Sequence, residues 1–435
     1  MKIAMMVRGY LPAPRPVDMI YAPIDLAVAL SEGLTKRGHT VDFFGPLGTK
    51  LEHVNVVTMH LRALATNQDE FRELLSNADE RMSHYVPALW DRYLSDEMFK
   101  RARRGDYDLL HFHHPEVALA CARLATEVPV VYTLHDPIYS WYKELFEMYQ
   151  TPNQHYISIS KNQRRDAPDL PYAGTVYNGI DLQYFPYANA PEDYLLIAGR
   201  IVPEKGIKEA IQVAKHTGNR LLIIGPVFPG TSQGYFEQYI KPQLSDQILY
   251  LGFVEQSQMW RYYQKAKAFL TPVQWEEPFG LTTIEAAACG TPTISLRRGA
   301  APEIIEHGKT GYIVDSIAEM ADAVNKIVDI KRADCRDRII AKFSIDIMVD
   351  AYEKAFEKIL RQHKRRSVAK PKPSVAKRFF AGNLPSLPGL GLPPLPGKKL
   401  LDALQAAPKP KPAKSKTTRK TTKHSNKPTQ KSAEK

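Results

Sequence analysis

Short apolar runs alternate with helix-like patterns over most of the chain, and this alternation limits its fold more than any other feature of the sequence. Each run has the length of a buried strand, and the segments between the runs repeat apolar residues at helical spacing. Strands that alternate with helices form βαβ units, which build parallel sheets with helices on their faces. The sequence therefore predicts an α/β fold.

The alternation comes in two series, which are separated by a break near residues 185–193. The strand-like runs of the first series lie at residues 2–7, 40–46, 108–114, 128–136 and 155–160. Those of the second series lie at residues 194–200, 220–226, 248–254, 268–273, 291–296 and 310–314. Two series predict two tandem, doubly wound Rossmann-like domains, at 1–185 and 186–342. One amphipathic helix at 343–366 would close the folded part and pack back toward the first domain.

The positive charge of the chain is concentrated near its C-terminus. Residues 366–435 carry 17 of the 59 Lys and Arg residues but two acids, whereas the rest carries 42 basic and 45 acidic side chains. Eleven of the 33 prolines also lie in this segment, with few aromatic residues, so it has too little apolar surface to fold. We expect residues 367–435 to be a disordered basic tail. Its charge leaves three alternatives open, namely an anionic membrane surface, a nucleic acid or no specific partner.

Cysteine spacing and apolar run length indicate the compartment. Cys121, Cys289 and Cys335 are far apart and form no C-x-x-C pair, which argues against a disulfide framework and a thiolate zinc site. The N-terminal apolar run is too short for a signal peptide, and no run approaches about 18 apolar residues. We therefore expect a cytoplasmic protein, with peripheral contact to a membrane left open.

The segment EEPFGLTTIEAAACGTP at residues 276–292 follows a predicted strand and contains a predicted helix from Leu281. In doubly wound sheets, ligands bind beyond the carboxyl ends of the strands, and a helix start attracts phosphate. Gly280 would let the backbone approach a ligand closely. Glu277 and Glu285 then have four alternatives: an acid–base pair, half of a metal site, two groups that hold hydroxyls on either side of a phosphate, or helix acids in solvent.

Two cations follow the first strand of the second series. Arg200 and Lys205 lie between a predicted strand and a predicted helix, in the segment AGRIVPEKG. One fork-shaped and one compact cation suit the two phosphates of a diphosphate, and the alternative is a pair of surface residues beside Glu204. Asn178 and Gly179 end an earlier strand and predict a tight turn or a close approach to a ligand.

Two other groups of polar residues have spacings found in metal sites. Asp106 and Asp108 form a D-x-D pattern, but they precede a predicted strand and so belong to the opposite end of the sheet from a ligand. His111, His113 and His114 end that strand, and no further spaced His or Cys completes a ligand set. We expect no metal ion here, and a structural or acceptor-side role for the histidines.

Four segments together, GRIVPEKG, NGID, EPFGLTTIEAAACGTPTI and APEIIEHGKTGYIV, resemble the retaining glycosyltransferases of family 4, also called group 1. The resemblance covers about residues 1–365 and is most specific in the second half. It implies a GT-B fold, in which two Rossmann-like domains face each other across a cleft. It also implies transfer of a hexose from a nucleotide-diphosphate sugar to an acceptor, which is left open as a glycan, a lipid or a small molecule.

The resemblance further implies roles for individual residues. Glu285 would hold the ribose hydroxyls of the nucleotide, and Glu277 would hold hydroxyls of the donor sugar. Arg200 and Lys205 would neutralise the diphosphate as it leaves, in place of a divalent metal, and no cofactor is expected. His135 would face the donor sugar from the first domain. The other donor-side residues, in the same motifs, are Asn178, Gly199, Phe279, Gly280 and Leu281.

The first domain departs from the family pattern after its first strand. Many members have a paired-glycine loop there, whereas this chain has RGYLPAPRPVDMIYAP. We assign Gly9, Asp18 and Tyr21 of this loop to the acceptor side. The predicted reaction is a front-side displacement with retention, in which the leaving phosphate takes the acceptor proton. The alternatives are a phosphorylase or sugar-nucleotide epimerase of the same fold, and a non-catalytic binding scaffold.

Overall fold

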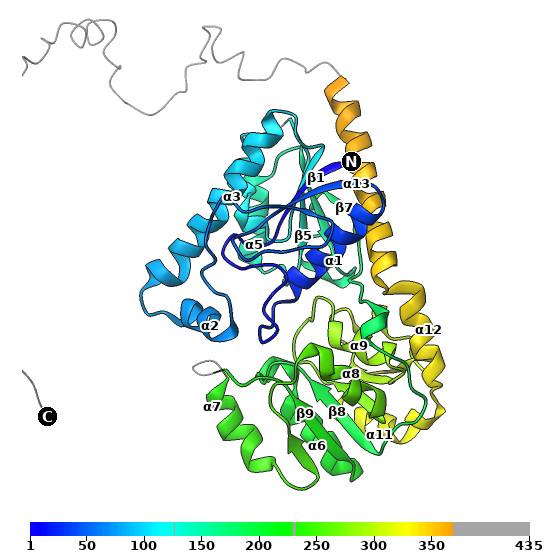
Figure 1. The fold of residues 1–435 in the computed structure, drawn as a ribbon. Helices are drawn as coiled ribbons and strands as arrows, with labels where there is room; N and C mark the ends of the chain where they lie inside the picture. Colours follow the sequence, from blue (N-terminus) through cyan, green and yellow to red (C-terminus); the bar gives the residue numbers. More distant parts are fainter. Residues whose placement is uncertain (126, 229–231, 369–435) are drawn as a thin grey trace, which may run out of the picture. The chain divides into compact units, whose positions relative to one another are not determined.

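The computed structural model describes residues 1–125, 127–228 and 232–368, and its framework is a pair of parallel sheets (Figure 1). The first sheet has seven strands in the order β3-β2-β1-β4-β5-β6-β7. Its strands are β1 (Lys2–Met6), β2 (Thr40–Phe44), β3 (Asn55–Val57), β4 (Leu109–Phe112), β5 (Val130–Leu134), β6 (Gln154–Ser158) and β7 (Tyr172–Thr175). The strand order reverses between β1 and β4, which is where doubly wound sheets bind ligands.

The second sheet has six strands in the order β10-β9-β8-β11-β12-β13, and all its pairs are parallel. Its strands are β8 (Tyr194–Ala198), β9 (Arg220–Ile224), β10 (Ile248–Tyr250), β11 (Ala268–Thr271), β12 (Thr293–Leu296) and β13 (Gly311–Val314). Here the order reverses between β8 and β11. The prediction of two parallel, doubly wound sheets is confirmed.

We call residues 1–175 the first lobe and residues 194–343 the second lobe. Helices of the first lobe are α1 (Ala22–Lys36), α2 (Gln68–Ser76), α3 (Val86–Arg103), α4 (Leu119–Ala122) and α5 (Ser140–Tyr149). Helices of the second lobe are α6 (Ile207–Thr217), α7 (Gln233–Tyr235), α8 (Gln256–Lys265), α9 (Leu281–Ala288), α10 (Ala301–Ile304), α11 (Ile317–Lys326) and α12 (Arg332–Lys342). A last helix, α13 (Ile345–Val368), follows the second lobe.

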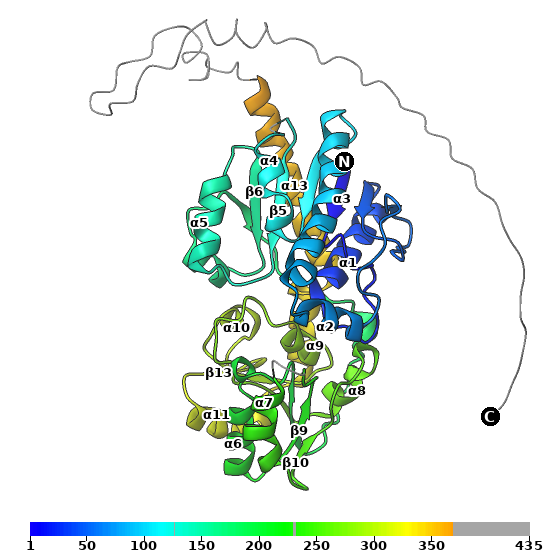
Figure 2. The same cartoon turned by 90° about the vertical axis from the view of Figure 1, so that its left-hand side faces the viewer.

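Helices cover both faces of the first sheet. α1 and α13 contribute to the core on one face, and α3, α4 and α5 contribute to the core on the other (Figure 2). Along β1, Ile3 and Met5 join the first of these cores, whereas Ala4 and Met6 join the second. A strand buried on both faces needs apolar residues at every position, which is why KIAMMV reads as an uninterrupted apolar run.

Helix α13 returns from the second lobe to the first. Its buried residues Met348, Tyr352, Phe356 and Ile359 belong to the core of the first sheet. α1 lies so close to it that a Cβ on Gly33 would come within 2.6 Å of the Val349 side chain. The predicted helix at 343–366 is therefore present, with bounds shifted by two residues at each end.

Three sequence expectations differ from the structure or lie outside it. The periodicity did not reveal β3, because it is an edge strand of three residues. The strand predicted to end at Asn178 ends at Thr175. The expected disordered tail lies outside the described residues except for its first two, which belong to α13. In the described part of the chain, no helix has the length and hydropathy needed to cross a membrane.

Candidate active site

A pocket opens at the carboxyl ends of β8 and β11, at the switch point of the second sheet. Four residues predicted from the motifs line it together, namely Lys205, Glu277, Phe279 and Gly280. Lys205 comes from the short 3-10 segment Pro203–Lys205 after β8, and the other three come from the loop between β11 and α9. The structure thus brings a cation, a carboxylate and a helix start into one site.

Lys205 and Glu277 form an ion pair inside this pocket. The Lys205 Nζ lies 2.7 Å from the Glu277 Oε2, and about a fifth of each side chain is exposed. The indole Nε1 of Trp275 donates to the same oxygen at 2.7 Å. Oε2 of Glu277 thus accepts from both Lys205 and Trp275, and these two contacts fix the orientation of the carboxylate. The other oxygen, Oε1, can accept from a ligand hydroxyl.

Gly280 begins α9 in a conformation that favours glycine. Its φ is +104°, and no side chain caps the first turn of the helix. The helix start therefore presents backbone N–H groups and the positive end of the helix dipole next to the pocket. This arrangement suits an oxyanion such as phosphate.

Glu285, one turn into α9, is buried and does not line the pocket. Tyr263 donates its hydroxyl to Glu285 Oε2 at 2.8 Å, and the Gln256 amide donates to Oε1 at 3.2 Å. Burial raises the pKa of Glu285 to about 7, although both hydrogen bonds act in the opposite direction. The interpretation of Glu285 as a helix acid in solvent is therefore wrong.

The loop after β1 reaches Glu285 from the first lobe. Arg15 donates to the Asp25 carboxylate at 2.7 Å and to the Gln256 side-chain oxygen at 2.5 Å. Gln256 in turn bonds Glu285, so the proline-rich loop is linked through one side chain to the carboxylate assigned to ribose. This loop was expected on the acceptor side, and the structure adds a connection to the donor side.

Arg200 and Gly199 lie beside the pocket but do not line it. The Lys205 side chain packs 3.6 Å from the position that a Cβ would take on Gly199. Arg200 is exposed. Burial and the charge of Glu116 raise the pKa of Asp136 in the first lobe, and the charge of Arg200 lowers it by a smaller amount. The Arg200 side chain is thus near the carboxyl ends of strands in both sheets.

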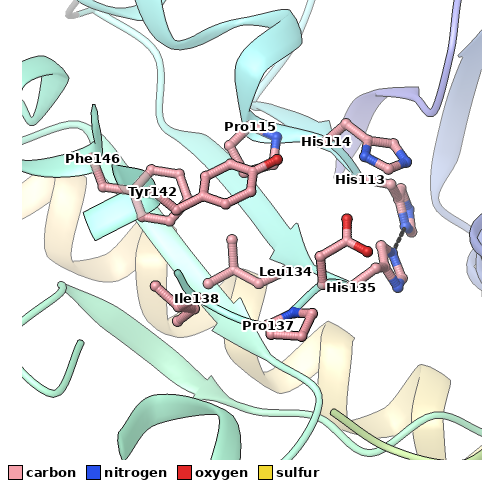
Figure 3. Close-up of a pocket in the computed structure, with 10 residues that line it drawn as sticks. His113, His114, Pro115, Leu134, His135, Pro137, Ile138, Tyr142 and Phe146 are labelled. Atoms are coloured by element: carbon pink, nitrogen blue, oxygen red, sulfur yellow. Dashed lines mark hydrogen bonds between the residues drawn. The ribbon is translucent and has the colours of Figure 1, made fainter. Parts of the chain in front are cut away.

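A second pocket lies at the carboxyl ends of β4 and β5 in the first lobe (Figure 3). His113, His114, His135 and Asp136 line it. The Nδ1 of His113 lies 2.9 Å from the Nε2 of His135, and the two rings are stacked. Burial lowers the pKa of His135 to about 3. The imidazole predicted to face the donor sugar is therefore neutral near pH 7, and His113 fixes its orientation.

The histidine cluster has protein partners rather than the geometry of a metal site. His111 Nε2 bonds the Thr133 hydroxyl at 2.9 Å, and His114 Nε2 bonds the Tyr21 hydroxyl at 2.6 Å. Among the described residues, no three His, Cys, Asp or Glu side chains are grouped so that they could hold a metal ion. Asp108 accepts from the backbone N–H of Lys2 at the start of β1, at the opposite end of the sheet.

The three acceptor-side residues have different surroundings. Tyr21 contacts the second pocket through its bond to His114. Gly9 donates its N–H to Asp91 at 2.6 Å, and a Cβ there would come within 2.5 Å of the Trp90 carbonyl oxygen. Asp18 is exposed and accepts from the first N–H of α2. Gly9 and Asp18 thus hold the loop against its neighbours, and neither lines either pocket.

Asn178, Gly179 and Leu281 line neither of the two pockets. A Cβ on Gly179 would come within 2.5 Å of the Ser344 carbonyl oxygen, so its close approach is to the segment before α13 and not to a ligand. Asn178 is buried beside it. Leu281 follows Gly280 as the first residue of α9 and packs its side chain against both lobes.

Several polar residues of the site escaped the sequence analysis. Arg298, after β12, lines the second-lobe pocket. Glu276 accepts from the Gly299 N–H at 2.8 Å and from the Asn162 amide of the first lobe at 3.1 Å. Glu303 accepts from the N–H groups of Lys161 and Asn162 at 2.9 and 2.8 Å. Their partners are distant in the chain, so no local pattern marks them.

Comparison with protein families agrees with this geometry. The model of glycosyl transferases group 1 matches residues 186–342, and that of glycosyltransferase family 4 matches residues 25–184. The two matches meet between the two sheets, and the first contains the whole second-lobe pocket. The chain belongs to the group 1 glycosyltransferases.

Individual relatives of this glycosyltransferase are distant in sequence. N-acetyl-alpha-D-glucosaminyl L-malate synthase of Bacillus anthracis is 24% identical over 78% of this chain and 94% of its own length. Putative glycosyltransferase YtcC of Bacillus subtilis is 24% identical over 54% of this chain and 66% of its own length. At such identities, donor and acceptor do not transfer from one member to another.

Solved structures of other glycosyltransferases share the fold. A sucrose-phosphate synthase from Thermosynechococcus elongatus has a TM-score of 0.63 at 18% identity, and the match covers 83% of this chain and 99% of that one. Anabaena HepE in complex with UDP and glucose has a TM-score of 0.60 at 18% identity, with 82% and 99% coverage. The GT-B prediction is thus confirmed.

Proposed function

We propose that this glycosyltransferase moves a hexose from a nucleotide-diphosphate sugar to an acceptor hydroxyl, with retention at the anomeric carbon and without a metal ion. The observation that carries the proposal is the pocket at the switch point of the second sheet. It combines the Lys205–Glu277 pair with the uncapped start of α9 at Gly280. A cation and a helix start suit a diphosphate, and a carboxylate suits the hydroxyls of a sugar.

The donor class is supported by the chemistry of the pocket and by one relative of the same fold. Anabaena HepE is described in complex with UDP and glucose, and its fold matches 82% of this chain. In this chain, Glu277 would accept from hydroxyls of the sugar, and Glu285 from those of the ribose. The diphosphate would lie between Lys205, Arg200 and the start of α9.

The developing charge of the leaving group explains the cations. When the bond between the anomeric carbon and the diphosphate breaks, negative charge builds up on the phosphate oxygens. Preorganised cations and backbone N–H groups stabilise such charge without reorganisation of solvent. Lys205 and Arg200, with the helix start, would supply this stabilisation in place of a divalent ion.

Front-side displacement fits the residues around the reacting carbon better than a covalent glycosyl intermediate does. Glu277, the carboxylate of the pocket, is tied by Lys205 and Trp275. His135, which would approach from the first lobe, is neutral and bonded to His113. The leaving phosphate oxygen would then take the proton of the acceptor hydroxyl as that hydroxyl attacks from the same face.

A thermal-shift panel tests the donor assignment. UDP, GDP and ADP and their hexose conjugates are added to the full chain, with EDTA in a parallel series. We expect one nucleotide series to raise the unfolding temperature, with the shift unchanged by EDTA. NMR of the product formed with that donor would then report the anomeric configuration. Absence of a shift with every nucleotide would favour the non-catalytic scaffold.

A further inference from the structure

A row of aromatic side chains begins four residues after His135. It consists of Tyr139, Trp141 and Tyr142, in the connection from β5 and the first turn of α5, and we call it the aromatic row. The rings of Tyr139 and Trp141 stack with centroids 6.2 Å apart, and those of Trp141 and Tyr142 with centroids 4.0 Å apart. Tyr139 and Trp141 are exposed to 49% and 56%. About half of each of these two residues is therefore accessible to a ligand.

The inner end of the aromatic row forms part of the first-lobe pocket. Tyr142 lines that pocket together with Phe146 and His135, and Figure 3 shows their rings around the same hollow. Tyr142 and Phe146 are themselves in ring contact at 5.3 Å. Aromatic side chains thus extend from the pocket that contains the candidate catalytic histidine to the exposed surface of the first lobe.

Carboxylates flank the aromatic row. Asp136 lines the pocket, and the Tyr142 hydroxyl donates to Glu116 at 3.4 Å. The nearby cation Arg8 is already paired, with Asp91 at 3.0 Å and with Glu116 at 2.6 Å. The carboxylates of Asp136 and Glu116 thus offer hydrogen-bond acceptors to the hydroxyl groups of a ligand.

A neutral saccharide matches this combination of groups. The C–H face of a pyranose packs on aromatic rings, whose π faces carry partial negative charge, while its hydroxyls donate to carboxylates. We propose that the aromatic row is the acceptor platform of this enzyme and that the acceptor is a neutral oligosaccharide. A sugar unit over Trp141 would extend the acceptor outward, with its terminal hydroxyl in the pocket beside His135. The assignment rests on the proposed function, because it places an acceptor next to the donor site.

An array of neutral, immobilised oligosaccharides, probed with the fluorescently labelled full chain, tests the platform. We expect the wild type to bind a subset of the glycans. Trp141→Ala should lower the apparent affinity for that subset by about tenfold or more, and Trp141→Phe should restore most of it. Tyr85→Ala is the matched control, because Tyr85 is also exposed (63%) but lies on the π-helical segment Arg81–Tyr85. It should bind like the wild type.

Two results would overturn the platform. One is a wild type that binds no glycan on the array, or that binds phospholipid vesicles or cationic ligands through Trp141 instead. The other is an undiminished glycan signal from Trp141→Ala. The donor-induced thermal shift, measured on the same samples, separates this inference from the proposed function. A shift that persists without glycan binding refutes the platform alone, whereas loss of the shift with every nucleotide refutes the donor assignment.

Discussion

Glu277 and Glu285 lie on one short segment but have opposite surroundings. Glu277 faces the pocket and pairs with Lys205, so a ligand hydroxyl can approach it directly. Glu285 is buried between Tyr263 and Gln256 and is half protonated near pH 7. A ribose hydroxyl at Glu285 would compete with the Gln256 amide. The two acids therefore differ in how readily they can bind a donor.

Removal of the Lys205 charge should impair turnover with little effect on folding. Lys205→Ala deletes the cation nearest the expected diphosphate, and loss of one such group typically costs about 10²–10³ in rate. We expect transfer or donor hydrolysis to fall by this factor, as measured by release of nucleoside diphosphate. The free energy of unfolding should change by less than about 1 kcal/mol, because the side chain is partly exposed.

Lys208→Ala is the matched control for this experiment. Lys208 is an exposed residue in the first turn of α6, three positions after Lys205, and it does not line the pocket. Its replacement should leave turnover within about twofold of the wild type. Equal activity of the two variants would refute the assignment of Lys205 to the diphosphate.

The raised pKa of Glu285 predicts a pH-dependent contribution to stability. The ordinary value of 4.5 becomes about 7 in the folded chain, so the folded state binds this proton more tightly than the unfolded state. The contribution is complete below pH 4.5 and is lost as the pH rises toward and beyond 7. Besides Tyr263 and Gln256, the charges that act on Glu285 are those of Asp25 and Arg15, which oppose each other.

Urea denaturation at pH 5, 6, 7 and 8 measures this effect. The free energy of unfolding of the wild type should fall relative to that of Glu285→Gln over this range, by on the order of 2 kcal/mol. Glu285→Gln keeps the shape of the side chain but does not titrate. A constant difference between the two proteins at all four pH values would show that Glu285 is ionised throughout.

The 3-10 segment η3 (Asn162–Asp166) after β6 is attached to the second lobe by two carboxylates. Glu303, on α10, accepts from Lys161 N, Asn162 N and the Tyr177 hydroxyl at 2.8–2.9 Å. Glu276 accepts from the Asn162 amide and lies 3.4 Å from the Arg165 guanidinium. Glu276 directly precedes Glu277, so this attachment also holds the loop that carries the pocket carboxylate.

Glu303→Gln should loosen this attachment. The carboxylate accepts through both of its oxygens, whereas a glutamine amide has only one oxygen, and its NH2 group donates. At least one N–H group would therefore lose its partner, at a cost of about 1–3 kcal/mol. We expect a lower urea midpoint and faster proteolysis within residues 181–193, between the sheets. Glu306→Gln, three residues further along the chain, serves as the control. Glu306 is exposed and forms surface ion pairs with Lys309 and Arg338, so this variant should unfold like the wild type. Identical midpoints for both variants would contradict the structural role of Glu303.

The end of the folded chain divides into a helix that the first lobe requires and a tail outside the described residues. α13 buries Tyr352, Phe356 and Ile359 in the core of the first sheet, and each large apolar side chain contributes about 1.5–3 kcal/mol. The Tyr352 hydroxyl also bonds Thr133, which bonds His111 beneath the first-lobe pocket. Loss of this helix would exceed what a marginally stable lobe tolerates.

Two truncations test this division. A chain that ends at Val368 should retain the unfolding temperature and the donor turnover of the full chain. A chain that ends at Phe343 should lose cooperative unfolding, as measured by calorimetry. Sedimentation of the full and the 368-residue chains with anionic vesicles or with nucleic acid would show whether the basic tail has either partner. Loss of donor turnover in the 368-residue chain would contradict the proposed boundary.

The local spacing of apolar residues and the position of one glycine were sufficient to predict the two parallel sheets and the start of α9. Uninterrupted apolar runs such as KIAMMV follow from burial on both faces of a parallel sheet, and this cause acts within five consecutive residues. Gly280 marked the start of α9, because its positive φ is a local requirement. Since strand ends of a parallel sheet meet at one edge, Lys205 and Glu277 were expected in one place, and the structure pairs them.

The surroundings of these residues depended on contacts between distant parts of the chain. Glu276 had no predicted role, because its partner Asn162 lies 114 positions away. The His113–His135 pair joins residues that follow two adjacent strands, and the Tyr263 hydroxyl that bonds Glu285 comes from a different helix. A hydrogen bond forms between whichever groups folding brings together, and sequence spacing does not encode this juxtaposition. The sequence thus determined the two sheets and the motif residues, and the tertiary structure alone decided their protonation, orientation and neighbours.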